Sequence, residues 1–170
     1  MAFEVGRILT ATHGPGLLKG RAEALAEITP FWLTHSPAQE VIIYSNIPDF
    51  SGIPAGIPAY NLHGISFTPL LLRWNFMNHN SNRNVPWLQA GAGVLWTTHI
   101  FPQGLGYPGS YTSIFNFTPQ VGVGESLFVK KNQSLNVGIQ LMNINNEGLG
   151  EYNPGVPYTL NFSIGYSWWK

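Results

Sequence analysis

The chain has 170 residues, which is the size of one domain and too short for two ordinary ones. Eight Lys and Arg residues balance eight Asp and Glu residues, so the formal net charge is zero and the basic footprint of a nucleic-acid binder is missing. Charged residues make up only 9% of the chain, against about 25% in an ordinary soluble domain, while 44% are hydrophobic. Because so few charges would promote association in water, we expect much of the exterior to face lipid or other subunits.

The chain contains no cysteine, which excludes a disulfide framework, a thiolate zinc site and a cysteine nucleophile. Its five histidines lack the spacing of metal ligands, and we expect neither a metal nor a cofactor. No apolar run approaches the roughly 18 residues of a membrane-spanning helix. Glu4 and Arg7 are charged residues at positions where a signal peptide would have its apolar stretch. We therefore expect that a signal peptide was removed or that the native chain begins before Met1.

The 19 Gly and 13 Pro residues favour many turns and few long helices. Between the turn clusters lie segments of strand length, several of which alternate apolar with polar residues. The segment from Leu18 to Ile28 contains the helix formers Ala and Glu. Its charged residues all occupy odd-numbered positions, as on one face of a strand, so we predict a strand there too. In chain order, the predicted strands are residues 2–11, 18–32, 62–76, 86–99, 111–125, 134–146 and 157–169.

The alternation is clearest in the last strand, where the apolar residues from Tyr158 to Trp168 alternate with small or polar ones from Thr159 to Ser167. A transmembrane β-barrel requires such a pattern, because lipid surrounds its outside while the enclosed polar groups bond to one another. Trp and Tyr residues near the strand ends suit the membrane interfaces. A soluble β-sandwich would show the same alternation with its apolar face inward, and the low charge favours the barrel.

We therefore predict an all-β fold, a small antiparallel transmembrane β-barrel formed by residues 1–170 as a single domain. Bacterial barrels have an even number of strands, eight at the least, so one strand is lacking. Residues 39–45 could supply it, but we favour a strand lost with the signal peptide. Eight strands enclose only enough space for side chains, so we expect no channel. The charges expected to pair inside the barrel are Arg7, Arg21, Glu23, Glu27, Arg73 and Glu125.

The run from Ile144 to Gly155, with its Asn-x-Gly-Leu and Asn-Pro-Gly elements, and the alternating strand to Trp169 resemble the lipid A deacylase family of outer-membrane barrels. These PagL-like proteins are also called acyloxyacyl hydrolases. The likeness extends through residues 13–27, 72–76 and 86–95 and covers most of the chain from about residue 13 onward. It implies an eight-stranded barrel of the bacterial outer membrane that removes an ester-linked acyl chain from lipid A with a Ser-His-Glu arrangement.

The family signature is His-x-Ser-Asn in the penultimate strand, with the acidic residue in the next strand. By this resemblance, the histidine position is Asn143, the serine position is Asn145, the retained asparagine is Asn146, and the acidic position is Pro157. All three catalytic positions are then substituted. An asparagine amide serves neither as nucleophile nor as proton acceptor, and proline cannot orient an imidazole. We therefore expect no useful deacylase activity by the family mechanism.

The resulting hypothesis is a catalytically degenerate, deacylase-like barrel that is a structural or interaction component of an envelope assembly. Its expected partners are outer-membrane lipid or lipopolysaccharide and other envelope proteins. Asn143 and Asn145 share the parity of the apolar face, so their amides could bind phosphate or sugar groups there, or be satisfied by water and turn backbone. One alternative is a deacylase that remains active through other residues, such as His99 with Glu147. The other is a soluble β-rich binding module.

Overall fold

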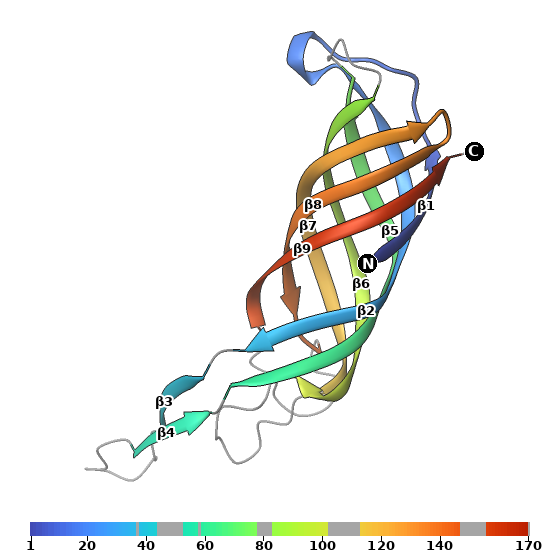
Figure 1. Cartoon of the computed structure of the whole chain (residues 1–170). Helices are drawn as coiled ribbons and strands as arrows, with labels where there is room; N and C mark the ends of the chain where they lie inside the picture. Colours follow the sequence, from blue (N-terminus) through green and yellow to red (C-terminus); the bar gives the residue numbers. More distant parts are fainter. Residues whose placement is uncertain are drawn as a thin grey trace.

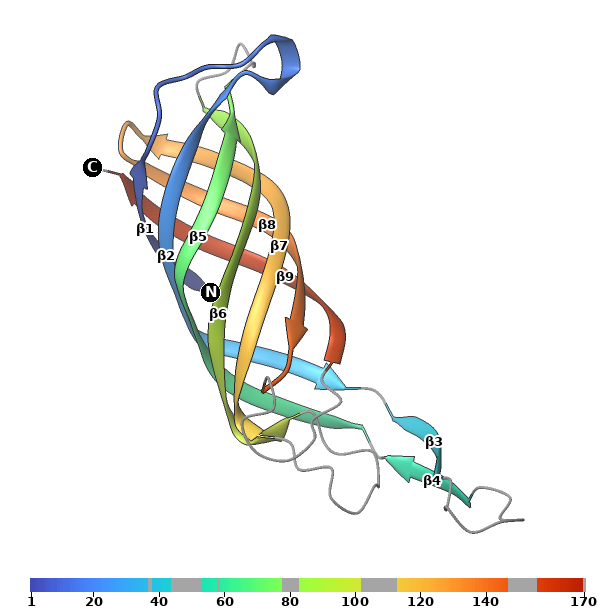
Figure 2. The ribbon, with the colours of Figure 1, turned by 180° about the vertical axis from the view of Figure 1, so that it is seen from behind.

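The computed structural model of the chain describes residues 1–36, 38–43, 53–57, 59–77, 83–101, 113–146 and 156–169. Seven strands form a closed barrel in the order β1-β2-β5-β6-β7-β8-β9, while β3 and β4 form a separate two-stranded sheet that projects from one end (Figures 1 and 2). The strands are β1 (Ala2–Ile8), β2 (Gly20–Ser36), β3 (Gln39–Ile43), β4 (Ile53–Ile57), β5 (Tyr60–Phe76), β6 (Asn84–Phe101), β7 (Ser113–Lys130), β8 (Gln133–Ile144) and β9 (Val156–Trp169). No helix in these ranges is long and apolar enough to cross a membrane.

The all-β barrel and its seven predicted strands are confirmed, with bounds that shift by a few residues. The ambiguous segment after Leu18 is a strand from Gly20 onward, preceded by a short 3-10 helix, η1 (Gly16–Leu18). Residues 39–45 do not supply an eighth barrel strand, because their described part, β3, pairs with β4 outside the barrel. The ring is therefore closed by seven described strands.

The apolar side chains of the barrel strands face outward. In β9, Leu160, Phe162 and Ile164 are 56%, 78% and 58% exposed, whereas the intervening Asn161 and Ser163 are half-buried. The same alternation of exposed and buried positions runs along β5, β7 and β8. A β-sandwich would bury these apolar faces between two sheets, so the sandwich architecture is wrong for this chain. A closed ladder with an apolar exterior is the arrangement that hydrocarbon tolerates.

A buried ion pair lies at the centre of the polar interior. Arg73 of β5 donates from Nη2 to Glu4 Oε1 of β1 at 2.9 Å and from Nη1 to Glu4 Oε2 at 3.1 Å. The same guanidinium donates to Gln89 Oε1 of β6 from Nε at 2.8 Å and Nη2 at 2.6 Å. Asn136 of β8 and Ser167 of β9 each donate to Glu4 Oε2 at 2.6 Å. The network thus joins five of the seven barrel strands through charge-assisted hydrogen bonds.

The predicted interior charges are confirmed only in part. Arg73, Glu23 and Glu27 are buried, and Asn75 Nδ2 donates to Glu23 Oε2 at 3.0 Å. The prediction for Arg7 is wrong, because the alternation of β1 turns Glu4 inward and leaves Arg7 exposed. Arg21 and Glu125 are half-buried. Glu4, the ion-pair partner of Arg73, was not among the predicted interior charges.

Trp87 fills the interior beside this network, and its ring lies 4.5 Å from the Arg73 guanidinium carbon. Glycines on β7 and β8 leave room for the ring: a Cβ added to Gly124 would meet Trp87 Cη2 at 2.7 Å and would overlap the Val137 carbonyl oxygen. A Cβ on Gly138 would overlap the same ring. These glycines therefore serve the close approach of the indole to the barrel wall.

Gly124→Ala is expected to destabilise the barrel by about 1–3 kcal/mol, because neither the indole nor the backbone carbonyl can move freely away. Gly165→Ala is the matched control, since its added Cβ would meet nothing closer than Glu4 Oε1 at 3.4 Å. The measurement is the midpoint of urea unfolding in detergent micelles, followed by tryptophan fluorescence. Equal midpoints for the two variants would contradict this account of the packing.

Candidate functional site

The two ends of the barrel differ in the length of their connections. At one end, residues 9–19 connect β1 with β2, residues 77–83 connect β5 with β6, and Lys131 and Asn132 connect β7 with β8. At the other end, residues 37–59 connect β2 with β5, residues 102–112 connect β6 with β7, and residues 145–155 connect β8 with β9, so the connections there are longer on average. Outer-membrane barrels carry their longer loops on the extracellular side. Because β8 ends at Ile144, the asparagines selected from the sequence lie at the end with the long connections (Figure 1).

Asn143 and Asn145 meet at this rim. Asn145 Nδ2 donates a hydrogen bond to Asn143 Oδ1, and both residues are half-buried. The backbone of Asn145 forms a bridge with Phe117 of β7, with N···O distances of 2.6 and 3.2 Å. Asn143 lies between the buried, inward-facing residues Met142 and Ile144, so its side chain is on the outward face, as predicted from the alternation. Asn146 is buried.

The third predicted position, Pro157, lies on the adjacent strand. The β8–β9 register pairs Met142 with Thr159 and Ile144 with Val156, so the stretch that contains Pro157 runs opposite Asn143. The side chain of Pro157 lies outside the described residues. The backbone thus brings the three sequence-selected positions together at one end of neighbouring strands, which is what a shared site requires.

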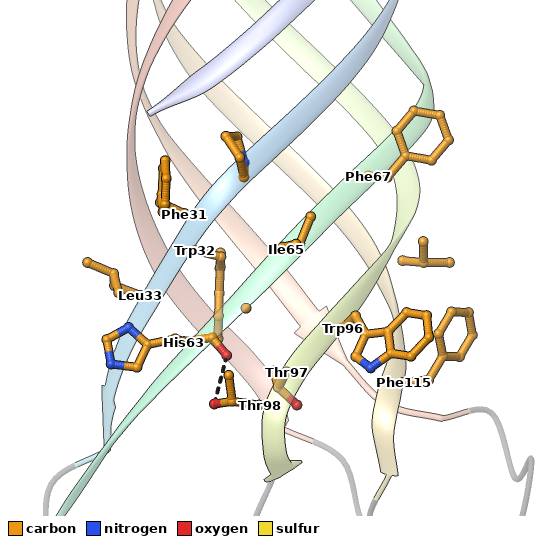
Figure 3. Close-up of a pocket in the computed structure, with 13 residues that line it drawn as sticks. Phe31, Trp32, Leu33, His63, Ile65, Phe67, Trp96, Thr97, Thr98 and Phe115 are labelled. Carbon is orange, nitrogen blue, oxygen red and sulfur yellow. Dashed lines mark hydrogen bonds between the residues drawn. The ribbon is translucent and has the colours of Figure 1, made fainter.

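An apolar groove of about 530 Å³ lies on the outer face near the same end. Its walls come from β2, β5, β6 and β7, and Figure 3 shows aromatic and aliphatic side chains arranged along it. The principal lining residues are Phe31, Leu33, Ile65, Phe67, Trp96 and Phe115. This groove was not predicted from the sequence, because its residues are spread over four strands and only the register brings them together.

Two phenylalanines connect the groove with the asparagine pair. Phe115 lines the groove and packs edge-to-face against Phe117, with ring centroids 5.6 Å apart. Phe117 is the residue whose backbone pairs with Asn145. A molecule with a polar part at the asparagines and a hydrocarbon part in the groove would therefore span neighbouring strands of one wall.

The described histidines do not assemble a triad with these asparagines. His13 packs against Trp74 at the opposite end, with ring centroids 5.0 Å apart. His35 Nδ1 bonds to Asn61 Oδ1 at 2.8 Å, while His63 lines the groove and accepts a hydrogen bond from Thr98 at its carbonyl oxygen (Figure 3). The side chain of His99 and all of Glu147 lie outside the described residues. Within the described ranges, no cluster of three or more His, Asp or Glu residues could hold a metal ion.

Comparison with known proteins gives one family. The family model described as lipid A 3-O-deacylase (PagL) matches residues 29–167. A search of curated proteins returns no match. Among solved structures, the crystal structure of the outer membrane enzyme PagL is similar, with 19% sequence identity and a TM-score of 0.45. The similarity covers 94% of this chain and 84% of that one.

Proposed function

Because this chain belongs to the lipid A 3-O-deacylase (PagL) family, we propose that it is a membrane barrel that binds a lipid of the lipid A class without hydrolysing it. The proposed location is the bacterial outer membrane, and the proposed role is that of a structural or interaction component of the envelope. One observation carries this proposal. At the positions that the resemblance assigns to the catalytic His and Ser, the chain has Asn143 and Asn145, and one amide donates to the other.

The chemistry of the rim suits binding better than ester hydrolysis. An asparagine amide offers two donors and one acceptor oxygen, which can bond to phosphate and sugar hydroxyl groups. It has no hydroxyl to attack an ester and no basic nitrogen to accept a proton. Hydrogen bonds from these amides to a phosphate would be charge-assisted, and so stronger than those between neutral groups.

The outer groove would hold an acyl chain of the same ligand. Its lining is apolar and aromatic, and it opens on the face where the other side chains of the wall are also apolar. An acyl chain lying in this groove would run along the barrel wall beside Phe115, one strand away from the asparagines. This placement is consistent with a lipid that reaches the site from within a bilayer.

The experiment is native mass spectrometry of the detergent-purified protein incubated with hexa-acylated lipid A. We expect a complex whose mass equals that of the protein plus intact lipid A. The double variant Asn143→Leu with Asn145→Leu is expected to bind at least tenfold more weakly, since it loses roughly two hydrogen bonds, each contributing about 0.5–1.5 kcal/mol to a neutral group and about 1.5–3 kcal/mol to a phosphate.

The matched control is Lys131→Ala, at the opposite end of the barrel, which should bind like the unchanged protein. A bound lipid that has lost one acyl chain would contradict the absence of hydrolysis. Failure of the unchanged protein to form any complex would contradict the binding role itself.

A further inference from the structure

A basic pocket lies at the end of the barrel that carries the shorter connections, which is the upper end in Figure 1. Its volume of about 460 Å³ is within the range of about 300–1,000 Å³ found for small-molecule sites. Four of the chain's eight Lys and Arg residues line it, namely Arg21, Arg83, Lys130 and Lys131. None of the described residues that line the pocket is acidic. In a chain without net charge, this local excess of cations suits an anionic ligand.

The strand pairing brings these cations together from distant parts of the sequence. The Phe128 N–H donates to the Arg83 carbonyl oxygen at 2.7 Å, so the start of β6 lies against the end of β7. Lys130 is the last residue of β7, and Lys131 begins the turn to β8. Arg21 comes from the start of β2, which reaches the same end through its ladder with β5. The folded barrel therefore gathers around one pocket the charges that the sequence keeps apart.

The pocket lies at the rim, where the barrel interior meets the outer face. Arg21 and Phe128 have the same parity as the buried Glu23 and Ser126 on their own strands, so they face the interior. Val129 also lines the pocket, but it faces outward and is 59% exposed. The other three cations are exposed at the rim. A ligand can thus place an anionic group among the cations and an apolar part against the outer face of β7.

The interior carboxylate beside the pocket does not balance these charges. Glu23 lies two residues further along β2 than Arg21, is buried, and accepts a hydrogen bond from Asn75 at 3.0 Å. One carboxylate can offset one of the four positive charges at most. The pocket therefore keeps a net positive charge.

We propose that this pocket binds the phosphate group of an anionic glycerophospholipid, whose acyl chains lie along the outer face of β7. This inference rests on the proposed membrane location, because a phospholipid reaches the rim from a bilayer. Guanidinium groups bind phosphate oxygens in pairs and ammonium groups add point charges, so the mixture of arginine and lysine suits a phosphate. Basic pockets at the membrane surface bind lipid headgroups in this way.

The apolar wall below the pocket favours a lipid over free phosphate. Val121, Val123 and Val129 are all exposed on the outer face of β7, in line with one another. Acyl chains that follow this face would gain the apolar contact that a free phosphate cannot use. The site lies at the opposite end of the barrel from Asn143 and Asn145, so it is separate from the proposed lipid A site.

The test is native mass spectrometry of the detergent-purified full chain with dioleoylphosphatidylglycerol, compared with the same concentration of zwitterionic dioleoylphosphatidylcholine. The variant Arg83→Gln with Lys130→Gln removes two charges from the pocket. Arg7→Gln with Lys19→Gln is the matched control, because both residues are exposed at the same end and neither is among those that line the pocket. Excess glycerol 3-phosphate, which carries the phosphate without acyl chains, is the competitor.

We expect phosphatidylglycerol to bind at least about fivefold more tightly than phosphatidylcholine. The pocket variant should lose at least about tenfold in affinity, since each cation near an anionic lipid contributes about fivefold, while the control should change by less than about twofold. Equal binding of the two lipids, or equal affinities of the two double variants, would overturn the proposal. Complete displacement by glycerol 3-phosphate would overturn it in favour of a soluble phosphate compound.

The two proposed lipid sites can be tested independently. Asn143→Leu with Asn145→Leu should keep full binding of phosphatidylglycerol, because the rim asparagines lie at the other end. Lys131→Ala leaves three of the four cations in the pocket, so it remains a control for the asparagine site. Loss of lipid A binding with intact phosphatidylglycerol binding would contradict the proposed function alone, and the reverse result would contradict this inference alone.

Discussion

Arg73→Met is expected to destabilise the barrel by about 3–5 kcal/mol, because it leaves the Glu4 carboxylate buried without its cationic partner. Glu4 would keep its hydrogen bonds from Asn136 and Ser167, but these do not neutralise its charge. Gln89 would at the same time lose the two donors that bond to its side-chain oxygen. The measurement is the free energy of unfolding in urea, followed by tryptophan fluorescence in liposomes.

Two further variants isolate the ion pair as the cause. Combining Arg73→Met with Glu4→Gln should recover much of the lost stability, because the neutral amide no longer needs a buried cation. Lys131→Met removes a positive charge from the exposed β7–β8 turn, outside the barrel wall, and should change stability by no more than about 0.5 kcal/mol. If Lys131→Met were as damaging as Arg73→Met, the loss would come from net charge and not from the interior network.

The second large effect concerns hydrolysis. The purified protein is expected to release fatty acid from lipid A about 10⁶-fold more slowly than a relative with an intact Ser-His-Glu triad, since loss of the triad in a serine hydrolase costs about that factor. The physical reason is that Asn143 and Asn145 provide neither a nucleophile nor a general base. Released fatty acid is measured by mass spectrometry, with an active triad-containing relative as the positive control.

Single variants distinguish an inactive site from one that works through other residues. Asn143→Ala and Asn145→Ala should leave the background rate unchanged. Clear turnover by the unchanged protein, abolished by His99→Ala or Glu147→Ala, would establish the alternative of a deacylase active through different residues. Turnover abolished by Asn145→Ala would show instead that the rim asparagines themselves take part in the reaction.

The side chains that face outward could be predicted from the sequence, because their positions follow from the local alternation along each strand. Successive residues of a strand point to opposite faces, so the alternation from Leu160 to Ile164 determines which side chains share a face. The low charge then indicated that the apolar face is the outer one, and the exposure of Phe162 confirms this. The positions of the rim asparagines followed from the same alternation, because the burial pattern of β8 continues to Ile144 although its register with β9 shifts after Met142.

Features that depend on strand register could not be predicted in this way. Glu4 and Arg73 are 69 residues apart, and no local pattern pairs them. Between Thr29 and Trp32 the β2–β5 register shifts, which changes the residues that face inward after it. The apolar groove depends on the register of four strands. The ion pair and the groove both arise from three-dimensional pairing, which no local sequence pattern specifies.

The central claim is that hydrocarbon surrounds the apolar faces of these strands, and lipid quenching tests it most directly. A fluorescent label on Val121→Cys, exposed on β7, is placed in liposomes whose acyl chains carry bromine, and Lys131→Cys in the β7–β8 turn is the control. We predict that bromine quenches the label at position 121 several-fold more than the label at position 131. Equal, weak quenching at both positions, with protein that stays monomeric in buffer without lipid or detergent, would contradict the membrane barrel and the lipid-binding role that depends on it.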